Sequence, residues 1–153
     1  MFCQVKIQLF LGIIATEVII LKILKHTILF YIGGMAYMFL EFAWRGRSHG
    51  TMFLLGGVCF LVLGQLSRLL PVKNLIVKGL SGTAAVTALE LATGLAVNRD
   101  YQIWDYRQLP FHFRGQICLL YSLRWIPVCL GAMAIYPLAE ELFHISQKTS
   151  RKI

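Results

Sequence analysis

Charged residues are scarce in this sequence. Asp, Glu, Lys and Arg make up 14% of its 153 residues, whereas soluble domains carry about 25%. Hydrophobic residues make up 58%, and the mean hydropathy is +0.68. Because so few charges cannot cover a water-facing surface, we expect the lipid bilayer to surround most of the chain. The length suits a single integral membrane domain over residues 1–153.

Acidic residues are scarcer than basic ones, and the formal net charge is +8. In a soluble protein such an excess would point to nucleic acid. Here Lys and Arg collect in short connections and in a basic tail at 140–153, where anionic lipid headgroups attract them. No basic stripe lies clear of the apolar segments, so the sequence predicts the lipid bilayer as a partner and no nucleic acid.

Recognisable site motifs are also missing. The four cysteines form no CxxC pair, and Cys59, Cys118 and Cys129 lie inside apolar runs, so they are expected to be small buried hydrophobic residues. His49 and His112 have no second His or Cys at ligand spacing. No Gly-x-Ser-x-Gly, Walker A or His-Glu-x-x-His motif occurs. We therefore predict no metal, no cofactor and no catalytic residue, and the balance is against an enzyme.

Long apolar runs are what the sequence does contain. A transmembrane helix needs about 20 mostly apolar residues, and the first run is not followed by a small-x-small cleavage site, so we expect it to remain as an uncleaved helix. Alternating strand patterns are absent. The predicted fold is an all-α, polytopic bundle of about five transmembrane helices, near residues 7–24, 27–44, 52–70, 75–97 and 115–138.

The connection at 98–114, "NRDYQIWDYRQLPFHFR", is long and rich in aromatic residues. Aromatic side chains suit the headgroup level of a bilayer, so this segment predicts an interfacial or re-entrant loop. We expect Trp104, Asp105 and Tyr106 to pack onto the ends of the second and fourth spans, with Asp105 bonded to Arg45 or Arg47. The alternative is that the rings only float among the headgroups and Asp105 is solvated.

Glu41 and Arg45 are four residues apart near the end of the second span. Residues at this spacing share a helix face, so we predict contact between the two side chains. A charge within the bilayer tends to face protein or water and to find a partner. The pair is either part of a packing seam at the membrane edge or part of a polar pocket that lines a path or a ligand site.

Glu90 lies within the fourth span and has no basic residue within one turn. It must stay protonated, meet water or pair across the bundle. Arg124 is another lone charge within a span, and either Glu17 or Glu90 is its candidate partner. With five spans, eight basic residues on the C-terminal side against six on the other place the C-terminus in the cytoplasm.

The stretches "YIGGMAYMFLEFAWRGRSHGTMFLLGGVCF", "TALELATGLAVN" and "WDYRQLPFHFRGQICLLYSLRW" resemble a family of small bacterial membrane proteins. The family is usually labelled "putative ABC-transporter permease, type IV". The likeness covers most of residues 31–125. This chain departs from the family pattern where Ser and Asn are usual, because it has Arg107 and His112 instead, and Arg114 and Arg124 replace residues expected to be uncharged.

The resemblance implies a multi-pass protein of the bacterial inner membrane with one polar, aromatic-rimmed site at one membrane face. Its candidate residues are Glu41, Arg45, His49, Glu90, Trp104, Asp105 and Tyr106. The function it implies is a transporter or permease-like component whose substrate the sequence does not reveal. The alternatives are a structural or regulatory membrane subunit without transport activity and, third, a membrane enzyme. An ATP-driven role would need a separate ATPase chain or another membrane subunit, and a homo-oligomer is a further expected assembly.

Overall fold

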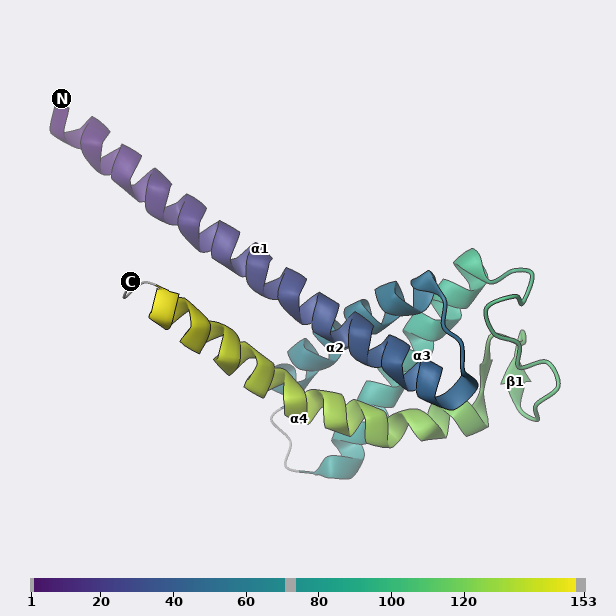
Figure 1. Ribbon diagram of the computed structural model, residues 1–153. Helices are drawn as coiled ribbons and strands as arrows, with labels where there is room; N and C mark the ends of the chain where they lie inside the picture. The colour runs from purple at the N-terminus through teal and green to yellow at the C-terminus, as the bar shows by residue number, and fades with distance from the viewer. Residues whose placement is uncertain (1, 71–73, 151–153) are drawn as a thin grey trace.

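The computed structural model describes the backbone of residues 2–70 and 74–150, and the side chains of residues 16–70 and 74–147. Within these residues the chain forms four helices and one short strand pair (Figure 1). The helices are α1 (Phe2–Arg45), α2 (Gly50–Leu69), α3 (Leu75–Val97) and α4 (Leu119–Ser150). The strands β1 (His112–Phe113) and β2 (Ile117–Cys118) pair antiparallel between α3 and α4.

The predicted all-helical membrane fold is confirmed, but the predicted count of about five spans was wrong. Four helices in the described residues are long and apolar enough to cross a membrane. The stretches 7–24 and 27–44 are one continuous helix, α1. No proline or glycine lies between Leu24 and Thr27 to break the helix, and the charge of Lys25 is met by Glu140 of α4 rather than by an exit into water.

The other boundaries agree with expectation except around the last span. The predicted spans 52–70 and 75–97 correspond to α2 and α3. The stretch predicted at 115–138 begins its helix later, at Leu119, because the strand pair precedes it. The segment expected to be a basic tail continues as helix to Ser150, the last residue whose backbone is described.

Close packing of helices rests on glycines. A Cβ atom on Gly33 of α1 would lie 2.9 Å from the carbonyl oxygen of Gly56 on α2 and 2.8 Å from Cγ of Phe60. One on Gly82 of α3 would lie 2.9 Å from Cβ of Cys129 on α4. Small residues allow such close approach between membrane helices. The chain thus forms two helical hairpins, α1 with α2 and α3 with α4. Helix α2 joins the two hairpins because it also packs against α3 and α4.

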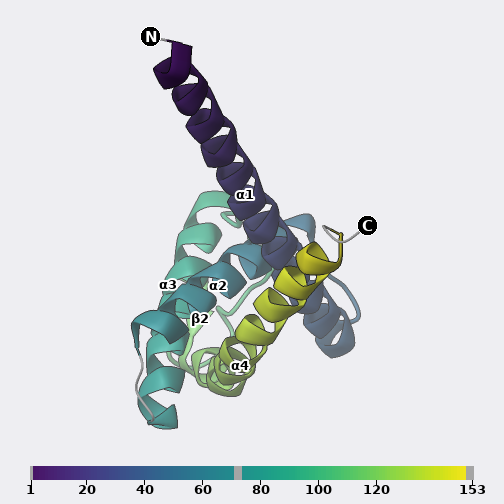
Figure 2. The ribbon, with the colours of Figure 1, turned by 90° about the vertical axis from the view of Figure 1, so that its left-hand side faces the viewer.

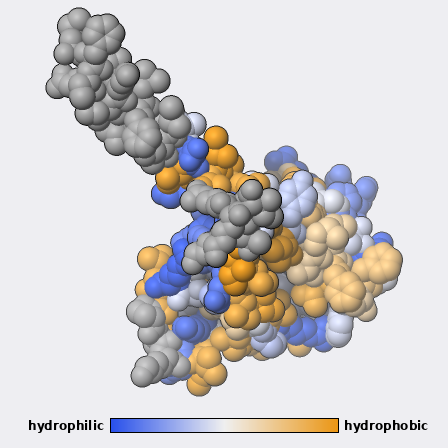
Figure 3. All heavy atoms as spheres, turned by 60° about the vertical axis from the view of Figure 1, so that its left-hand side comes forward, coloured by the Kyte–Doolittle hydropathy of each residue, from blue (hydrophilic) through white to orange (hydrophobic). Residues whose placement is uncertain are grey.

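The buried core is small and is centred on α2. Its main cluster comprises Met52, Leu55, Cys59, Leu63, Val86, Trp104, Cys129 and Met133. A second cluster, Leu29, Phe60 and Tyr136, lies where α1 crosses α4. Many other large apolar side chains are exposed, and Figure 3 shows apolar atoms over much of the visible face. Such a surface suits a protein whose solvent is lipid.

Charged residues mark two levels along the bundle. Lys25 and Arg45 of α1 are 20 positions apart, which is about 30 Å of helix at about 1.5 Å per residue and matches the hydrocarbon thickness of a bilayer. Arg68 and Glu140 lie at the level of Lys25 because both join its ion-pair cluster. The ends of α1 and α4 project beyond this level from the same end of the bundle (Figures 1 and 2).

Candidate functional site

The end of α1 carries the predicted ion pair. Nη2 of Arg45 contacts Oε2 of Glu41, one helical turn earlier, which confirms the expected contact. Nη1 of Arg45 also lies 3.5 Å from the carbonyl oxygen of Ile103 in the loop that follows α3. The helix ends directly after Arg45 because Gly46 adopts a left-handed backbone, with φ of 66°, that favours glycine. Arg45 therefore joins the end of α1 to the long loop.

Glu90 of α3 is buried, with 3% of its surface exposed. Its Oε1 accepts a hydrogen bond from the Tyr106 hydroxyl over 3.0 Å, and its Oε2 accepts one from Nε1 of Trp125 over 3.2 Å. Two neutral aromatic donors, one from the loop and one from α4, therefore hold this carboxyl group.

The expectation that Arg124 pairs with Glu17 or Glu90 was wrong. The guanidinium of Arg124 lies 5.0 Å from the ring centre of Trp44 and 4.8 Å from that of Tyr121. Stacking on aromatic faces satisfies an arginine near the membrane surface without a carboxylate. Among the described side chains, no ion pair links Arg124 to either glutamate.

Aromatic stacks hold both donors to Glu90 in place. Trp125 stacks on Tyr37 of α1 with ring centres 5.5 Å apart and planes 21° apart. Tyr106 stacks on Tyr121 with centres 4.8 Å apart and planes 22° apart. Burial, with the nearby charge of Glu90, raises the pKa of the Tyr106 phenol well above its usual range, so Tyr106 remains a hydrogen-bond donor.

A cavity of about 10 Å³ lies between these groups, close to the space that one water molecule needs. The side chains that line it are Tyr37, Glu41, Arg45, Met52, Leu55, Glu90, Trp104 and Tyr106. The Glu41–Arg45 pair and Glu90 therefore border one small cavity at one end of the bundle. We call Glu41, Arg45, Glu90, Tyr106 and Trp125 the polar cluster.

Two buried amides fold the loop back onto this cluster. Nδ2 of Asn98 donates to the carbonyl oxygen of Trp104 over 2.7 Å and to Oε1 of Gln116 over 3.0 Å. Nε2 of Gln116 donates to the Asn98 carbonyl over 2.9 Å, and Nε1 of Trp104 donates to the Gln116 carbonyl over 2.8 Å. The expected packing of Trp104 and Tyr106 against the bundle is confirmed. Sequence reasoning missed Gln116. The available signal was that Asn98 and Gln116 are amide side chains at the two ends of the loop.

Asp105 does not join the cluster, and its predicted bond to Arg45 or Arg47 was wrong. Oδ2 of Asp105 lies 2.8 Å from Nη2 of Arg107, and Oδ1 accepts from Nε of Arg107 over 2.9 Å and from its backbone N–H over 3.0 Å. These bonds lower the pKa of Asp105 to about 2. Arg107 lies two positions later in the chain and offers both a backbone donor and a guanidinium donor. It therefore satisfies the carboxylate locally.

His49 is also outside the cluster. It is the exposed N-cap of α2, where its Nδ1 accepts from the backbone N–H of Thr51 over 3.3 Å. It borders a separate pocket of about 260 Å³ against the loop, shared with Asn98 and Asp100 among others. The structure thus brings together Glu41, Arg45, Glu90, Trp104 and Tyr106, and it leaves His49 and Asp105 apart. In the part of the chain with described side chains, no group of three or more His, Cys, Asp or Glu residues could hold a metal ion.

A second charged cluster lies at the other end of the bundle. Nζ of Lys25 on α1 lies 3.1 Å from Oε1 of Glu140 on α4, and Nη2 of Arg68 on α2 contacts Oε2 of the same carboxylate. Arg68 also lies over the ring of Tyr136, 5.6 Å from its centre. The sequence did not reveal this cluster because Glu140 was assigned to a tail and Lys25 to a connection between two spans.

An apolar cleft of about 270 Å³ opens between α1 and α4 within the membrane-spanning part. Ile32, Tyr37 and Leu40 line it on α1, and Trp125 and Ile135 line it on α4. Its lining contains no charged side chain. Tyr37 and Trp125 therefore border both this cleft and, through the Trp125–Glu90 hydrogen bond, the polar cluster.

A family model described as "Putative ABC-transporter type IV" matches residues 5–153. Searches of curated proteins and of solved structures gave no match to this chain. The four apolar helices agree with the membrane location that the family description implies. Because the match spans nearly the whole sequence, the chain belongs to the family described as "Putative ABC-transporter type IV".

Proposed function

We propose that this chain is a permease-like membrane component of a transporter, in which the polar cluster forms part of the substrate path. One observation carries the proposal: Glu90 is buried beside the Glu41–Arg45 pair around a shared cavity. A charge within a bilayer costs roughly 2.5–3.5 kcal/mol on insertion scales, and such residues commonly mark substrate or ion pathways. A bundle selected only for stability would be served as well by apolar side chains there.

The size of the cavity sets a requirement on this path. A space of about 10 Å³ holds about one water molecule, whereas pockets for small molecules measure about 300–1,000 Å³. The path must therefore widen by a conformational change or by assembly with another subunit. In an ATP-driven transporter the energy would come from a separate ATPase chain, because this sequence carries no Walker A motif.

The apolar cleft supports entry from the side. The stacked rings of Tyr37 and Trp125 border the cleft, and Trp125 also donates to the carboxyl group of Glu90. In the proposed path, movement of these rings connects the cleft with the polar cluster. This arrangement favours a substrate that reaches the site from the bilayer of the bacterial inner membrane, either in this chain alone or within a homo-oligomer.

A second candidate is a structural or regulatory membrane subunit without transport activity. The small volume of the cavity favours it, since a permanently dry bundle needs no wider path. The two functions differ in whether water ever reaches the polar cluster.

Cysteine accessibility distinguishes them. Leu55 lines the cavity, and Met133 of α4 is about equally buried but lines neither the cavity nor the apolar cleft. In a background without the native cysteines, membrane vesicles carrying Leu55→Cys or Met133→Cys would be treated with a membrane-impermeant methanethiosulfonate reagent. A transport path predicts modification at position 55 and none at position 133. Equal protection of both cysteines, with His49→Cys modified as the exposed control, would favour the structural subunit.

A further inference from the structure

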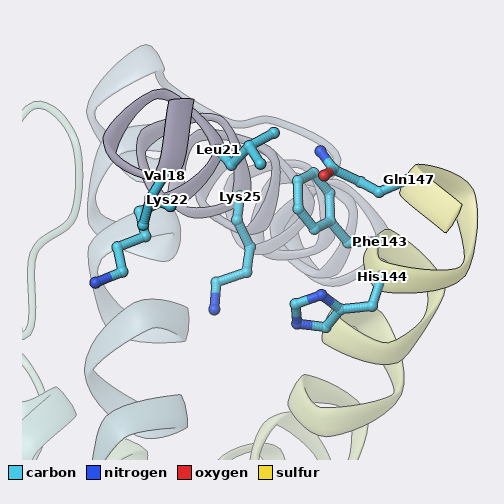
Figure 4. A pocket seen from close by; sticks show the side chains of 7 residues that line it. All are labelled: Val18, Leu21, Lys22, Lys25, Phe143, His144 and Gln147. Carbon is cyan, nitrogen blue, oxygen red and sulfur yellow. The ribbon is translucent and has the colours of Figure 1, made fainter. Parts of the chain in front are cut away.

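A groove separates the projecting ends of α1 and α4, and it has a volume of about 510 Å³. Figure 4 shows the side chains that line it. Lys22 and Lys25 extend from α1, and His144 and Gln147 line the groove from α4. This groove lies at the end of the bundle opposite the polar cluster and takes no part in the proposed transport path.

The position of the groove places it at a membrane surface. Leu29 of α1 and Tyr136 of α4 belong to one buried cluster. The Lys25–Glu140 ion pair lies about one turn away from it, towards the projecting ends of both helices. That ion pair marks the bilayer boundary, because Lys25 is about 30 Å of helix away from Arg45. The groove begins at this boundary and extends outward, so it lies at the level of the lipid headgroups.

The charge balance of the groove is positive. Lys25 and Arg68 share a single carboxylate, that of Glu140. Lys22 forms no ion pair within the described part of the chain. Glu17 and Glu141 lie on the same two helical segments but are not among the residues that line the groove. The lining of the groove therefore carries two lysines and no acidic side chain.

The groove also has an apolar wall. Leu21 and Val18 lie on the same face of α1 as the two lysines, at helical spacing, and Phe143 faces them from α4. A site with cations beside apolar surface, at headgroup depth, suits an amphiphile with an anionic head. Basic pockets between transmembrane helices on the cytoplasmic side bind anionic lipid headgroups in this way.

The four-span topology places this end of the bundle in the cytoplasm. An even number of crossings puts both termini on one side. Nine Lys and Arg residues then lie on the side of the groove, against six on the loop side. The nine are Lys6, Lys22, Lys25, Arg68, Lys73, Lys78, Lys148, Arg151 and Lys152, and the six are Arg45, Arg47, Arg99, Arg107, Arg114 and Arg124. The excess predicts a cytoplasmic location, where anionic lipids are present.

We propose that the α1–α4 groove binds an anionic phospholipid, with Lys22 and Lys25 contacting its phosphate and with Leu21 and Phe143 contacting its apolar part. The lipid would bridge the two projecting helix ends beyond their crossing point. The site does not depend on transport activity, because every residue in it lies at the membrane face opposite the polar cluster.

Native mass spectrometry of the full chain in detergent tests the proposal. Dioleoylphosphatidylglycerol would be titrated against wild type, Lys22→Gln, Lys22→Arg and, as the matched control, Lys78→Gln. Lys78 is a lysine at the same membrane face but outside the groove. We expect phosphatidylglycerol to bind wild type in preference to dioleoylphosphatidylcholine. Lys22→Gln should weaken that binding by about fivefold, as expected for one lysine near a lipid surface, while Lys22→Arg and Lys78→Gln retain it.

Several outcomes would overturn the proposal. Equal binding of the two lipids, or an equal loss in Lys22→Gln and Lys78→Gln, would indicate general surface attraction. Displacement of the lipid by millimolar inorganic phosphate would indicate a site for free phosphate. A dimer that is lost in Lys22→Gln, with no preference for phosphatidylglycerol, would show that a second copy of the chain covers the groove. Lys22 is exposed, so its variants are expected to fold, and unfolding temperatures would verify this.

Discussion

The hydroxyl of Tyr106 donates a hydrogen bond to Oε1 of Glu90 over 3.0 Å. The bond connects the long loop at one membrane face with a buried carboxyl group of α3. Trp125 of α4 holds the second oxygen of the same group. Any movement of the loop that carries Tyr106 outward therefore removes one of the two donors and uncovers Glu90.

Tyr106→Phe is expected to destabilise the protein by about 1–3 kcal/mol, the usual cost of leaving a buried hydrogen-bonding group without its partner. The ring still stacks on Tyr121, so the change removes mainly the hydroxyl donor. Thermal or denaturant unfolding in detergent would measure the effect. Tyr101→Phe is the matched control, because its hydroxyl donates to the Arg114 carbonyl at an exposed position over 3.3 Å. Equal effects of the two changes would show that the bond to Glu90 has no special weight.

Glu90→Gln should be tolerated far better than Glu90→Lys. Glutamine keeps an oxygen that can accept from Tyr106 or Trp125 and carries no charge. Lysine accepts no hydrogen bond, so both aromatic donors would lose their acceptor beside a buried cation. Breaking such an arrangement costs about 3–5 kcal/mol, whereas the loss of one hydrogen bond costs about 1–3 kcal/mol. The yield of monodisperse protein and its unfolding temperature would measure both variants. A Lys variant as stable as the Gln variant would mean that position 90 meets water.

The parts of the site that the sequence predicted depend on local spacing or on composition. The Glu41–Arg45 contact follows from two side chains on one helical turn. The inward packing of Trp104 follows from an aromatic-rich segment that would be poorly solvated as a free loop. Both conclusions needed no knowledge of which helices are neighbours.

The parts that failed depend on tertiary pairing. Lys25 is compatible with a helix end or a helix interior, and only Glu140, more than a hundred residues later, decides between them. Arg124 could have met a carboxylate, but its guanidinium lies over two aromatic rings. Asp105 pairs with Arg107, two residues away, and not with Arg45 or Arg47, the long-range partners that the sequence suggests. A sequence lists the partners that a charge could take, and the packing of the helices selects one.

Two glycines in different surroundings should respond in opposite ways to alanine. Gly33→Ala would place a methyl group 2.9 Å from the Gly56 carbonyl oxygen and closer still to the Phe60 side chain, so overpacking should cost about 1–3 kcal/mol. A Cβ on Gly131 of α4 would meet nothing within 4 Å. Gly131→Ala should therefore gain up to about 1 kcal/mol from helix propensity.

Unfolding of both glycine variants under one detergent condition would test this pair. An unchanged stability of Gly33→Ala would contradict the close approach of α1 and α2, and a loss of stability in Gly131→Ala would contradict the open space beside α4. The comparison is well controlled because both changes are Gly to Ala within a membrane-spanning helix, and only the space around the new methyl group differs.

The Asp105–Arg107 pair should make stability depend on pH within a defined window. Hydrogen bonds from Arg107 lower the pKa of Asp105 to about 2 in the folded protein, whereas an unfolded aspartate titrates near pH 3.9. Between these values the unfolded state binds more protons, so the contribution of the pair is complete above about pH 4 and is lost as the pH falls towards 2. Wild type should therefore be more stable than Asp105→Asn at pH 6, and the difference should shrink over that window.

Unfolding temperatures from pH 6 to pH 2 would measure this difference. Asp100→Asn is the control, since Asp100 forms no ion pair among the described side chains. A difference that stays constant with pH would show that Asp105 acts through neutral hydrogen bonds alone.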